Sequence, residues 1–302
     1  MRERLLAHLR ALIAERHPLS SPAALQQAEG YLAEQFRLLG LEVSTHSFEA
    51  LGGTYRNVIG RMPVPKGDAG GDCPPSAWGL SPFCDVSPPP LIIAAHYDTV
   101  MGSPGADDNA SALAVMLEVA RYLRGVTLSR EVRFIAFCLE EEDLLGSLAY
   151  ALSLREANRE IAGAIVLECV GYAKSEEGSQ RKPPGVPVVV PTVGDFLAIV
   201  GNTASAVLAA AVEGAARECV PDLKTVALTV PGNGELLPDA RRSDHAAFWH
   251  YGYPAVMLTD TANFRNPHYH RSTDNLDTLN LEFMEKVAQA VTASAIRLCA
   301  TS

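Results

Sequence analysis

Acidic and histidine side chains gather in four short segments of this 302-residue chain, each after an apolar run. The first, HYDTVMGSPGADDNASA at residues 96–112, holds one histidine, three aspartates and an asparagine. The others are EEED at 140–143, Glu168 at the end of AIVLE, and NPHYHRSTDN at 266–275. Carboxylates drawn together in a medium of low dielectric constant repel one another, and a divalent cation between them removes that cost.

The donor atoms available in these segments predict the kind of metal. Two histidines and three carboxylates are the candidate ligands: His96, His270, Asp108, Glu141 and Glu168. Nitrogen and oxygen donors without sulfur suit zinc, with cobalt or manganese as the alternatives. Three carboxylates exceed what one ion requires. This indicates two ions about 3.5–4 Å apart, bridged by a carboxylate and a water, as in hydrolytic enzymes.

Each segment also has an ordinary structural explanation when it is taken alone. A single His96 is more often a core histidine, and Asp107, Asp108 and Asn109 precede a helical pattern, where such residues cap the helix. The EEED run is typical of an exposed helix start, and HYHRSTD of a polar loop. All four segments nevertheless follow a core strand, and this shared position favours a common site.

The elements that must position these segments alternate between strand and helix. Apolar or alternating runs predict strands at 41–48, 55–62, 91–95, 132–138, 162–168 and 254–259. Helical patterns occupy 110–123, 144–154, 204–219 and 281–299. This alternation predicts an α/β three-layer sandwich, with a mostly parallel, mixed central sheet flanked by helices. Ligands bind at the carboxyl ends of such strands, so we expect the four segments to converge there.

A single domain spanning residues 1–302 is expected. Two amphipathic helices open it, and the second starts at Pro22, a residue suited to the first turn. The Pro- and Gly-rich stretch 63–90 cannot pair as a central strand and is expected to be an excursion loop. Residues 172–243 begin polar and proline-rich, and we expect them to form a cap over the sheet edge.

Composition excludes several classes of partner. The formal net charge of −10 argues against nucleic acid. No segment reaches about 18 uninterrupted apolar residues, and charges interrupt the N-terminus, so we expect a cytoplasmic protein without a membrane partner. The six cysteines form no CxxC pair, which argues against a thiolate zinc site. Cys73 and Cys84 share the excursion loop and are a candidate disulfide, which a reducing compartment disfavours. The oligomeric state stays open.

Seven motifs, in their order from about residue 57 to 280, resemble those of the co-catalytic di-zinc aminopeptidases. This peptidase family also includes glutamate carboxypeptidases and glutaminyl cyclases. The motifs are HYDTV, SPGADDNAS, AFCLEEEDLLGS, VLECVGYA, RRSDHAAFW, GYPAVMLTD and RNPHYHRSTDNLDTL. Their combination is far more specific than any one of them.

The resemblance implies a role for each candidate residue. Metal ligands would be His96, Asp108 as the bridge, Glu141, Glu168 and His270. Asp98 would orient His96, as metal-bound imidazoles commonly require. Glu140 would act as general base, with the register fixed by counting back from LLGS. The peptide bond after Asp108 is often cis in this family.

Some positions depart from the usual family pattern. Glu168 replaces a more common aspartate, Asp143 stands where glycine is frequent, and Ala112 replaces another glycine. Asp244, in RRSDHAAFW, is a candidate for positioning substrate, and a structural role is an equal alternative.

The resemblance therefore predicts a zinc-dependent aminopeptidase that acts on peptides with a free N-terminus. The expected cofactor is a pair of zinc ions, and the cap is expected to shape the pocket for a side chain. Two alternatives stay open: another activity of the same family, such as a carboxypeptidase or a glutaminyl cyclase, and a non-catalytic member that serves as a binding module.

Overall fold

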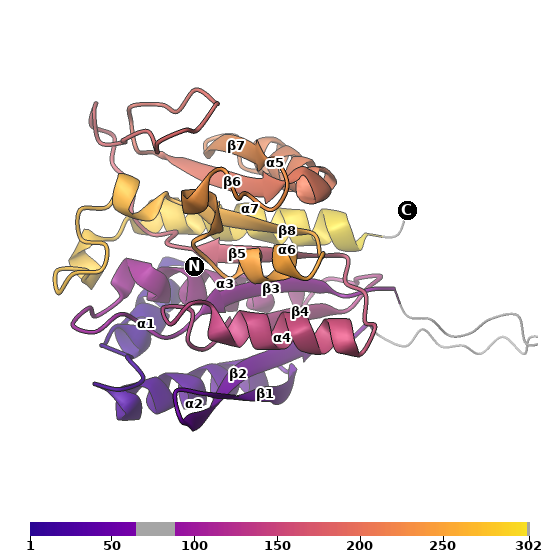
Figure 1. Ribbon diagram of the computed structural model, residues 1–302. Coiled ribbons are helices and arrows are strands. Elements are labelled where there is room, and N and C mark those ends of the chain that lie inside the picture. Colours follow the sequence, from indigo (N-terminus) through magenta and orange to yellow (C-terminus); the bar gives the residue numbers. More distant parts are fainter. Residues whose placement is uncertain (65–87, 301–302) are drawn as a thin grey trace, which may run out of the picture.

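A single eight-stranded sheet organises the protein, and the computed structural model describes residues 1–64 and 88–300 (Figure 1). The strands lie in the order β1-β2-β4-β3-β5-β8-β6-β7. Their bounds are β1 Glu42–Ala50, β2 Gly53–Met62, β3 Leu91–His96, β4 Val132–Phe137, β5 Gly163–Glu168, β6 Phe196–Asn202, β7 Lys224–Val230 and β8 Ala255–Thr259. Four of the seven neighbouring pairs are parallel, including β4–β3, β3–β5 and β5–β8 at the centre. The predicted three-layer α/β fold with a mixed, mostly parallel sheet is confirmed.

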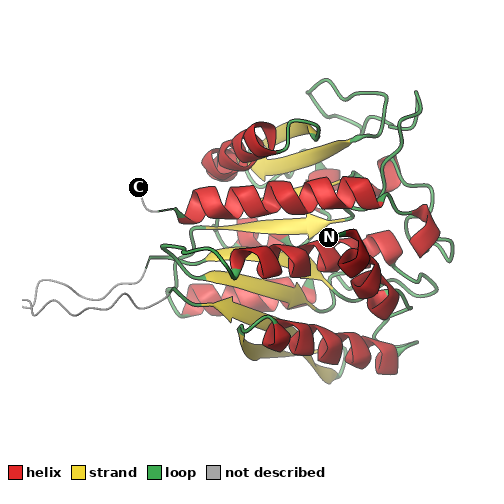
Figure 2. Ribbon diagram, turned by 180° about the vertical axis from the view of Figure 1, so that it is seen from behind, coloured by secondary structure: helices red, strands yellow, loops and turns green. Residues whose placement is uncertain are grey.

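Helices cover both faces of this sheet. The main helices are α1 Arg2–Leu12, α2 Pro22–Leu38, α3 Ala112–Leu123, α4 Leu145–Glu156, α5 Ala206–Cys219, α6 His245–His250 and α7 Leu281–Cys299. Figure 2 shows α1, α2, α3, α5 and α7 together on one face, and Figure 1 shows α4 and α6 on the other. A π-helical turn, Ala106–Ser111, leads into α3.

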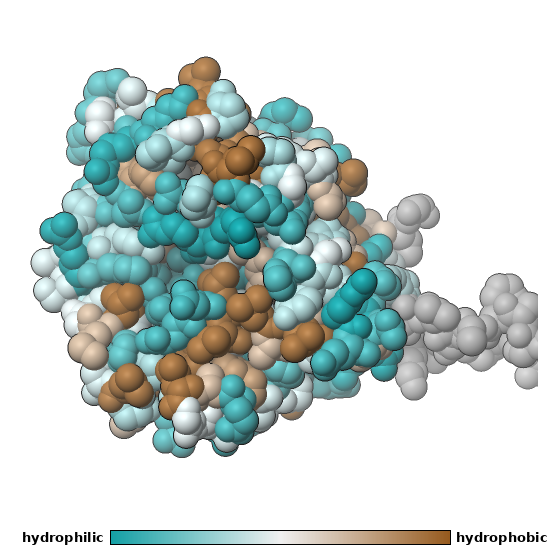
Figure 3. All heavy atoms as spheres, in the orientation of Figure 1, coloured by the Kyte–Doolittle hydropathy of each residue, from teal (hydrophilic) through white to brown (hydrophobic). Residues whose placement is uncertain are grey.

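The period of two along the strands builds a separate core on each face. In β3, Leu91, Ile93 and Ala95 pack with the five-helix face, whereas Ile92 and Ala94 pack toward α4 and α6. All six residues of β3 are buried, as expected for a central strand covered on both sides. Apolar side chains also reach the solvent side of α4, where Leu152 is exposed, and Figure 3 shows brown patches over this helix.

Pro22 begins α2 as expected, and a glycine ends it. Pro22 occupies the first turn, and Gly40, with a φ of +76°, ends the helix in a left-handed conformation. Ser21 is the N-cap residue, but its hydroxyl makes no capping bond and instead accepts from the backbone N–H of His17, 2.8 Å away.

Strands β6 and β7 lie within residues 172–243, the segment predicted to form a cap over the sheet edge. Residues 196–230 form β6, α5 and β7 and are themselves that edge of the sheet (Figure 1, top). Strand β6 pairs antiparallel with β8, which lies more than 50 residues later in the chain, so no local sequence pattern indicates this pairing. The excursion loop lies mostly outside the described residues, and so do Cys73 and Cys84.

Among the described residues, no helix has the length and apolar character needed to cross a membrane.

Candidate active site

Four neighbouring strands bring the predicted site residues together at the carboxyl ends of the strands. His96 is the last residue of β3, Glu168 is the last residue of β5, and Glu140 and Glu141 follow β4. His270 lies in the loop after β8, at a φ of +58°. Because β4, β3, β5 and β8 are parallel neighbours, their carboxyl ends meet there.

Asp108 lies between the two histidines. Its Oδ1 is 3.1 Å from His96 Nε2, and its Oδ2 is 3.0 Å from His270 Nε2. Each imidazole thus approaches a different oxygen of one carboxylate. The Asp108–Asn109 peptide bond is cis, as the family resemblance implied.

A further carboxylate accompanies each histidine. Glu168 Oε2 is 3.4 Å from His96 Nε2, and Glu141 Oε2 is 3.2 Å from His270 Nε2. Glu140 Oε2 lies 3.8 Å from His96 Nε2 and faces the same space. The cluster therefore has two sides that share Asp108.

Several buried polar atoms of this cluster lie close to one another but form no hydrogen bond of acceptable geometry. They are both ring nitrogens of His96, Asp108 Oδ1 and Glu141 Oε1. Buried polar atoms are normally satisfied, so orphans of this kind call for an explanation. In two sets of three, His96 with Glu140 and Glu168 and His96 with Asp108 and Glu141, the ligand atoms lie within 4.8 Å of one another, and such imidazole and carboxylate donors fit a divalent cation.

Burial and mutual repulsion perturb the acids and histidines together. Burial raises the pKa of Glu140 well above its usual value, and neighbouring carboxylates raise it further. Burial and the charge of Asp108 raise the pKa of Glu141 to about 7. Burial lowers the pKa of His270, but hydrogen bonds to Asp108 and Glu141 outweigh it and raise the value to about 10. Protons therefore balance the charges here, and a bound cation would displace them.

Asp98 links three parts of the site. It lies 3.5 Å from His96 Nδ1, and its two oxygens accept the backbone N–H groups of Glu140 and Glu141, each at 3.1 Å. One buried carboxylate thus fixes the loop after β4 relative to the end of β3.

Asp107 points away from the histidines, unlike its neighbour Asp108. Its oxygens accept the backbone N–H of Gly171 at 2.8 Å and the side-chain amide of Asn266 at 2.7 Å. These hydrogen bonds give Asp107 a structural role, because they join the turn before α3 to Gly171 and Asn266. Asp274, four residues after His270 in the fourth segment, accepts the backbone N–H groups of both aspartates.

Two supporting residues escaped the sequence analysis or received no role in it. Asn109 donates to the carbonyl of Leu167 and accepts the N–H of Cys169, each at 3.0 Å, which brackets Glu168. Ser243 donates to Glu168 Oε2 at 2.8 Å. The only local signal for a role of Asn109 was its position next to Asp108. The only signal for Ser243 was its place in the motif RRSDHAAFW.

Asp244 directly follows Ser243, which contacts Glu168. It is fully buried, and neither of its carboxylate oxygens has a hydrogen-bond partner. Burial and the charges of Glu168 and Asp98 raise its pKa to about 7, against the lowering effect of His96. Asp244 is not among the residues that line the adjoining pocket, so its role with substrate stays a prediction.

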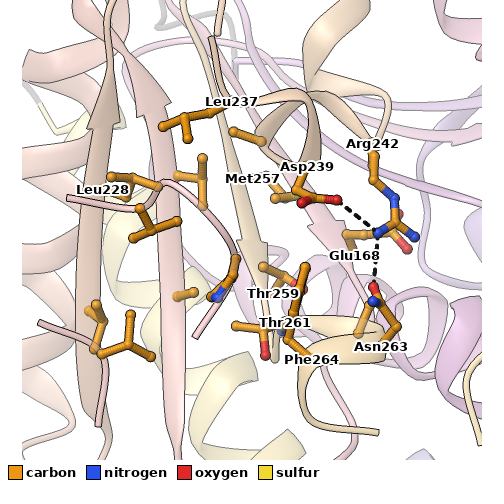
Figure 4. A pocket seen from close by; sticks show the side chains of 18 of the residues that line it. Glu168, Leu228, Leu237, Asp239, Arg242, Met257, Thr259, Thr261, Asn263 and Phe264 are labelled. Atoms are coloured by element: carbon orange, nitrogen blue, oxygen red, sulfur yellow. Dashed lines mark hydrogen bonds and ion pairs between the residues drawn. The ribbon is translucent and has the colours of Figure 1, made fainter. Parts of the chain in front are cut away.

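An apolar pocket opens beside the cluster (Figure 4). Its cavity volume is about 100 Å³, and it is partly open to solvent. Its walls include Val188, Val190, Phe196, Val200, Leu228 and Met257, contributed by the 183–190 loop and strands β6, β7 and β8. Glu168 lines the pocket too, and Figure 4 shows Leu228 at the opposite end from it.

Polar side chains gather at the Glu168 end of this pocket. Arg242 donates to Asn263 Oδ1 at 2.8 Å and to the Tyr269 hydroxyl at 3.1 Å, and it pairs with Asp239 at 3.3 Å. Tyr269 directly precedes His270, so this network joins the pocket rim to the histidine side of the cluster.

A sequence profile described as Peptidase family M28 matches residues 85–295, more than half of the chain. The chain belongs to peptidase family M28. The predicted family resemblance is confirmed, and with it the predicted enzyme class, a hydrolase of the metallopeptidase type.

Individual relatives agree with this family. The chain is 33% identical to uncharacterized protein YfbL of Escherichia coli over 96% of this chain and 86% of YfbL. It is 29% identical to aminopeptidase YwaD of Bacillus subtilis over 72% of this chain but only 43% of YwaD. The LapA aminopeptidase of Legionella pneumophila shares the fold, with a TM-score of 0.73 and 19% identity over the whole of this chain and 70% of LapA. The chain thus spans less than half of YwaD.

Proposed function

We propose that this protein is a zinc-dependent aminopeptidase that hydrolyses the N-terminal peptide bond of peptides. The observation that carries the proposal is the contact between the acid–histidine cluster and the apolar pocket through Glu168. Reactive groups at the mouth of a pocket for one side chain suit an enzyme that removes one residue at a time. YwaD, a relative of the same family, is named as an aminopeptidase.

The proposed cofactor is a pair of zinc ions, with cobalt and manganese as alternatives. His96 and Glu168 would hold one ion, His270 and Glu141 the other, and Asp108 would bridge them through its two oxygens. When bound, zinc lowers the pKa of water and polarises a carbonyl group.

Glu140 is the proposed general base. Its carboxylate faces the space beside His96, and it is largely buried, with an exposed fraction of 9%. It would accept the proton of the attacking water and deliver it to the departing amine. Asp98 would act as a positioning residue, because it fixes the backbone of Glu140 through a hydrogen bond of 3.1 Å.

The substrate would enter with its cationic amine toward the acids. The net charge of −10 and the buried carboxylates favour a positive group at the cluster. The side chain of the first residue would occupy the apolar pocket, whose walls favour a large apolar group. Segments 183–190 and 237–242, both within the predicted cap, supply part of those walls.

A substrate panel with a matched blocked control tests the activity. Zinc-loaded protein should release nitroaniline from leucyl-p-nitroanilide and leave N-acetyl-leucyl-p-nitroanilide intact. Trimming from the C-terminus, or cyclisation of N-terminal glutamine with one zinc per chain, would assign one of the other family activities. Two bound zinc ions without turnover on any substrate would assign a binding module.

The Glu140→Gln variant separates the base from the metal site. It should retain two zinc ions per chain by mass spectrometry and lose turnover, because glutamine cannot accept the proton. Unchanged turnover would place the base elsewhere.

A further inference from the structure

A buried arginine follows helix α1 and contacts the loop between His96 and Asp108. Arg16 has an exposed fraction of 1%. Within residues 1–64 and 88–300, no carboxylate forms an ion pair with it, although a buried cation is costly without compensation. Arg16 therefore requires an explanation other than a salt bridge.

Backbone carbonyl groups satisfy the guanidinium from two directions. Nε donates to the carbonyl of Tyr97 at 2.7 Å, and Nη1 and Nη2 donate to those of Pro104 and Gly105 at 3.1 and 3.2 Å. Nη1 also donates to the carbonyls of Leu12 and Ala14, in the segment that carries Arg16 itself.

The three loop carbonyls belong to the segment that joins two proposed ligands. Tyr97 directly follows His96, and Gly105 lies three residues before Asp108. The loop closes tightly on the guanidinium, because a Cβ added at Gly105 would meet Arg16 Nη2 at 2.9 Å and the Asp108 carbonyl at 2.4 Å. The backbone N–H of Arg16 adds a bond to Thr99 Oγ1 at 2.8 Å.

The chemistry of the arginine side chain explains its presence here. Its planar fork presents five donors, so one side chain reaches both ends of the loop, whereas lysine is a point charge. Burial lowers the pKa of Arg16 to about 10, and the charges of Asp98, Asp108, Asp274 and Glu141 oppose that lowering. The charges that favour this cation therefore belong to the acidic site and its supports.

We propose that Arg16 is a positioning residue that holds the 97–105 loop, and with it the spacing of His96 and Asp108, so that zinc binds a site formed in advance. The inference rests on the proposed zinc site. Repulsion between the guanidinium and the zinc ions would act in the opposite sense, so the two effects predict opposite results for substitution.

Zinc affinity, measured by competition with a chromogenic chelator, distinguishes the two effects. Arg16→Gln removes the charge and the fork, and Arg16→Lys keeps the charge and loses the fork. Positioning predicts that both variants bind zinc about ten- to a hundredfold more weakly, the range for residues that support ligands. Repulsion predicts that Arg16→Gln binds zinc more tightly and Arg16→Lys as the wild type does, which would overturn the proposal.

Arg4→Gln is the matched control, because Arg4 lies on α1 and pairs with Glu118 at 2.8 Å. It should lower stability without changing zinc affinity. Thr99→Val removes only the loop's bond to the Arg16 backbone and decides the question if both arginine variants fail to fold. It should weaken zinc binding about fivefold, the equivalent of one hydrogen bond.

A second readout needs no metal. In zinc-free protein, the amides of the 97–105 loop should exchange hydrogen faster in Arg16→Lys than in the wild type, and equal exchange would refute the inference. Unchanged zinc affinity in the variants refutes this inference alone, whereas a wild type that binds no zinc refutes the proposed function as well.

Discussion

The pocket wall offers a test of how the protein selects the first residue of its substrate. Val188 lines the pocket, while the next residue, Val189, has an exposed fraction of 90%. Leucine buries three more carbon atoms than alanine, each worth about 0.8 kcal/mol in an apolar site. The sum, about 2.4 kcal/mol, predicts that kcat/KM for leucyl-p-nitroanilide exceeds that for alanyl-p-nitroanilide by about 60-fold.

The same substitution at these adjacent positions should then have different effects. Val188→Trp places an indole in the pocket and should reduce the leucine-to-alanine ratio of kcat/KM below about 5, because the indole fills the space that the leucine side chain of the substrate would occupy. Val189→Trp should leave the ratio near 60 and serves as the matched control. Both ratios come from initial rates, with kcat and KM determined separately.

Two results would refute the reasoning about the pocket. One is a Val188→Trp variant with an unchanged ratio and an unchanged melting temperature, which would place the leucine side chain elsewhere. The other is a wild type without preference between the two substrates, which would show that the pocket takes no part in binding.

Three further predictions concern the fold and the bridge. His245 is fully buried, and burial lowers its pKa from 6.5 to about 4. The contribution of neutral His245 to the free energy of unfolding is therefore complete above pH 6.5 and is lost as the pH falls toward 4, because the unfolded state binds the proton first. In urea unfolding of zinc-free protein, the free energy of unfolding of the wild type should fall by roughly 2.5 kcal/mol more than that of His245→Gln between pH 7.5 and 4.5. Asn280 caps α7 by accepting the N–H of Phe283 at 3.0 Å, so Asn280→Ala should cost about 1 kcal/mol in the same assay, and no loss would contradict the cap. Asp108→Ala should lose zinc by mass spectrometry, whereas Asp107→Ala should keep zinc and melt at a lower temperature; the reverse pattern would exchange their roles.

The positions of the site residues along the chain were predictable because they depend on local patterns. An apolar run followed by acids or histidine indicates a strand that ends at a polar edge, and this reasoning placed His96, the 140–143 run and Glu168 correctly at strand ends. His270 needed the same argument over a longer loop. Which oxygen of Asp108 approaches which histidine had no sequence signal, because it depends on His96 and His270, which lie 174 positions apart in the chain.

The pocket could not be predicted in the same way. Its walls come from β6, β7 and β8 and the 183–190 loop, and β6 pairs antiparallel with β8. The sequence of β6, FLAIVGN, is apolar enough for a strand, but its partner is not encoded locally. Local patterns therefore predict a cap for residues 172–243, whereas the pairing of β6 with β8 makes part of this segment the edge of the sheet.

Arg16 illustrates the same limit for a single residue. An arginine just after an amphipathic helix is usually exposed, and nothing near it in sequence indicates burial against the 97–105 loop.

The sequence by itself determined the chemistry: nitrogen and oxygen donors, their order along the chain, and their placement after apolar strands. Tertiary structure alone decided the geometry: Asp108 between two histidines, Asp107 turned away to Gly171 and Asn266, and a pocket that shares Glu168 with the cluster. The physical reason is that donor type and strand pattern are local properties of the chain. Distances between side chains far apart in sequence depend instead on how the strands pair and the helices pack.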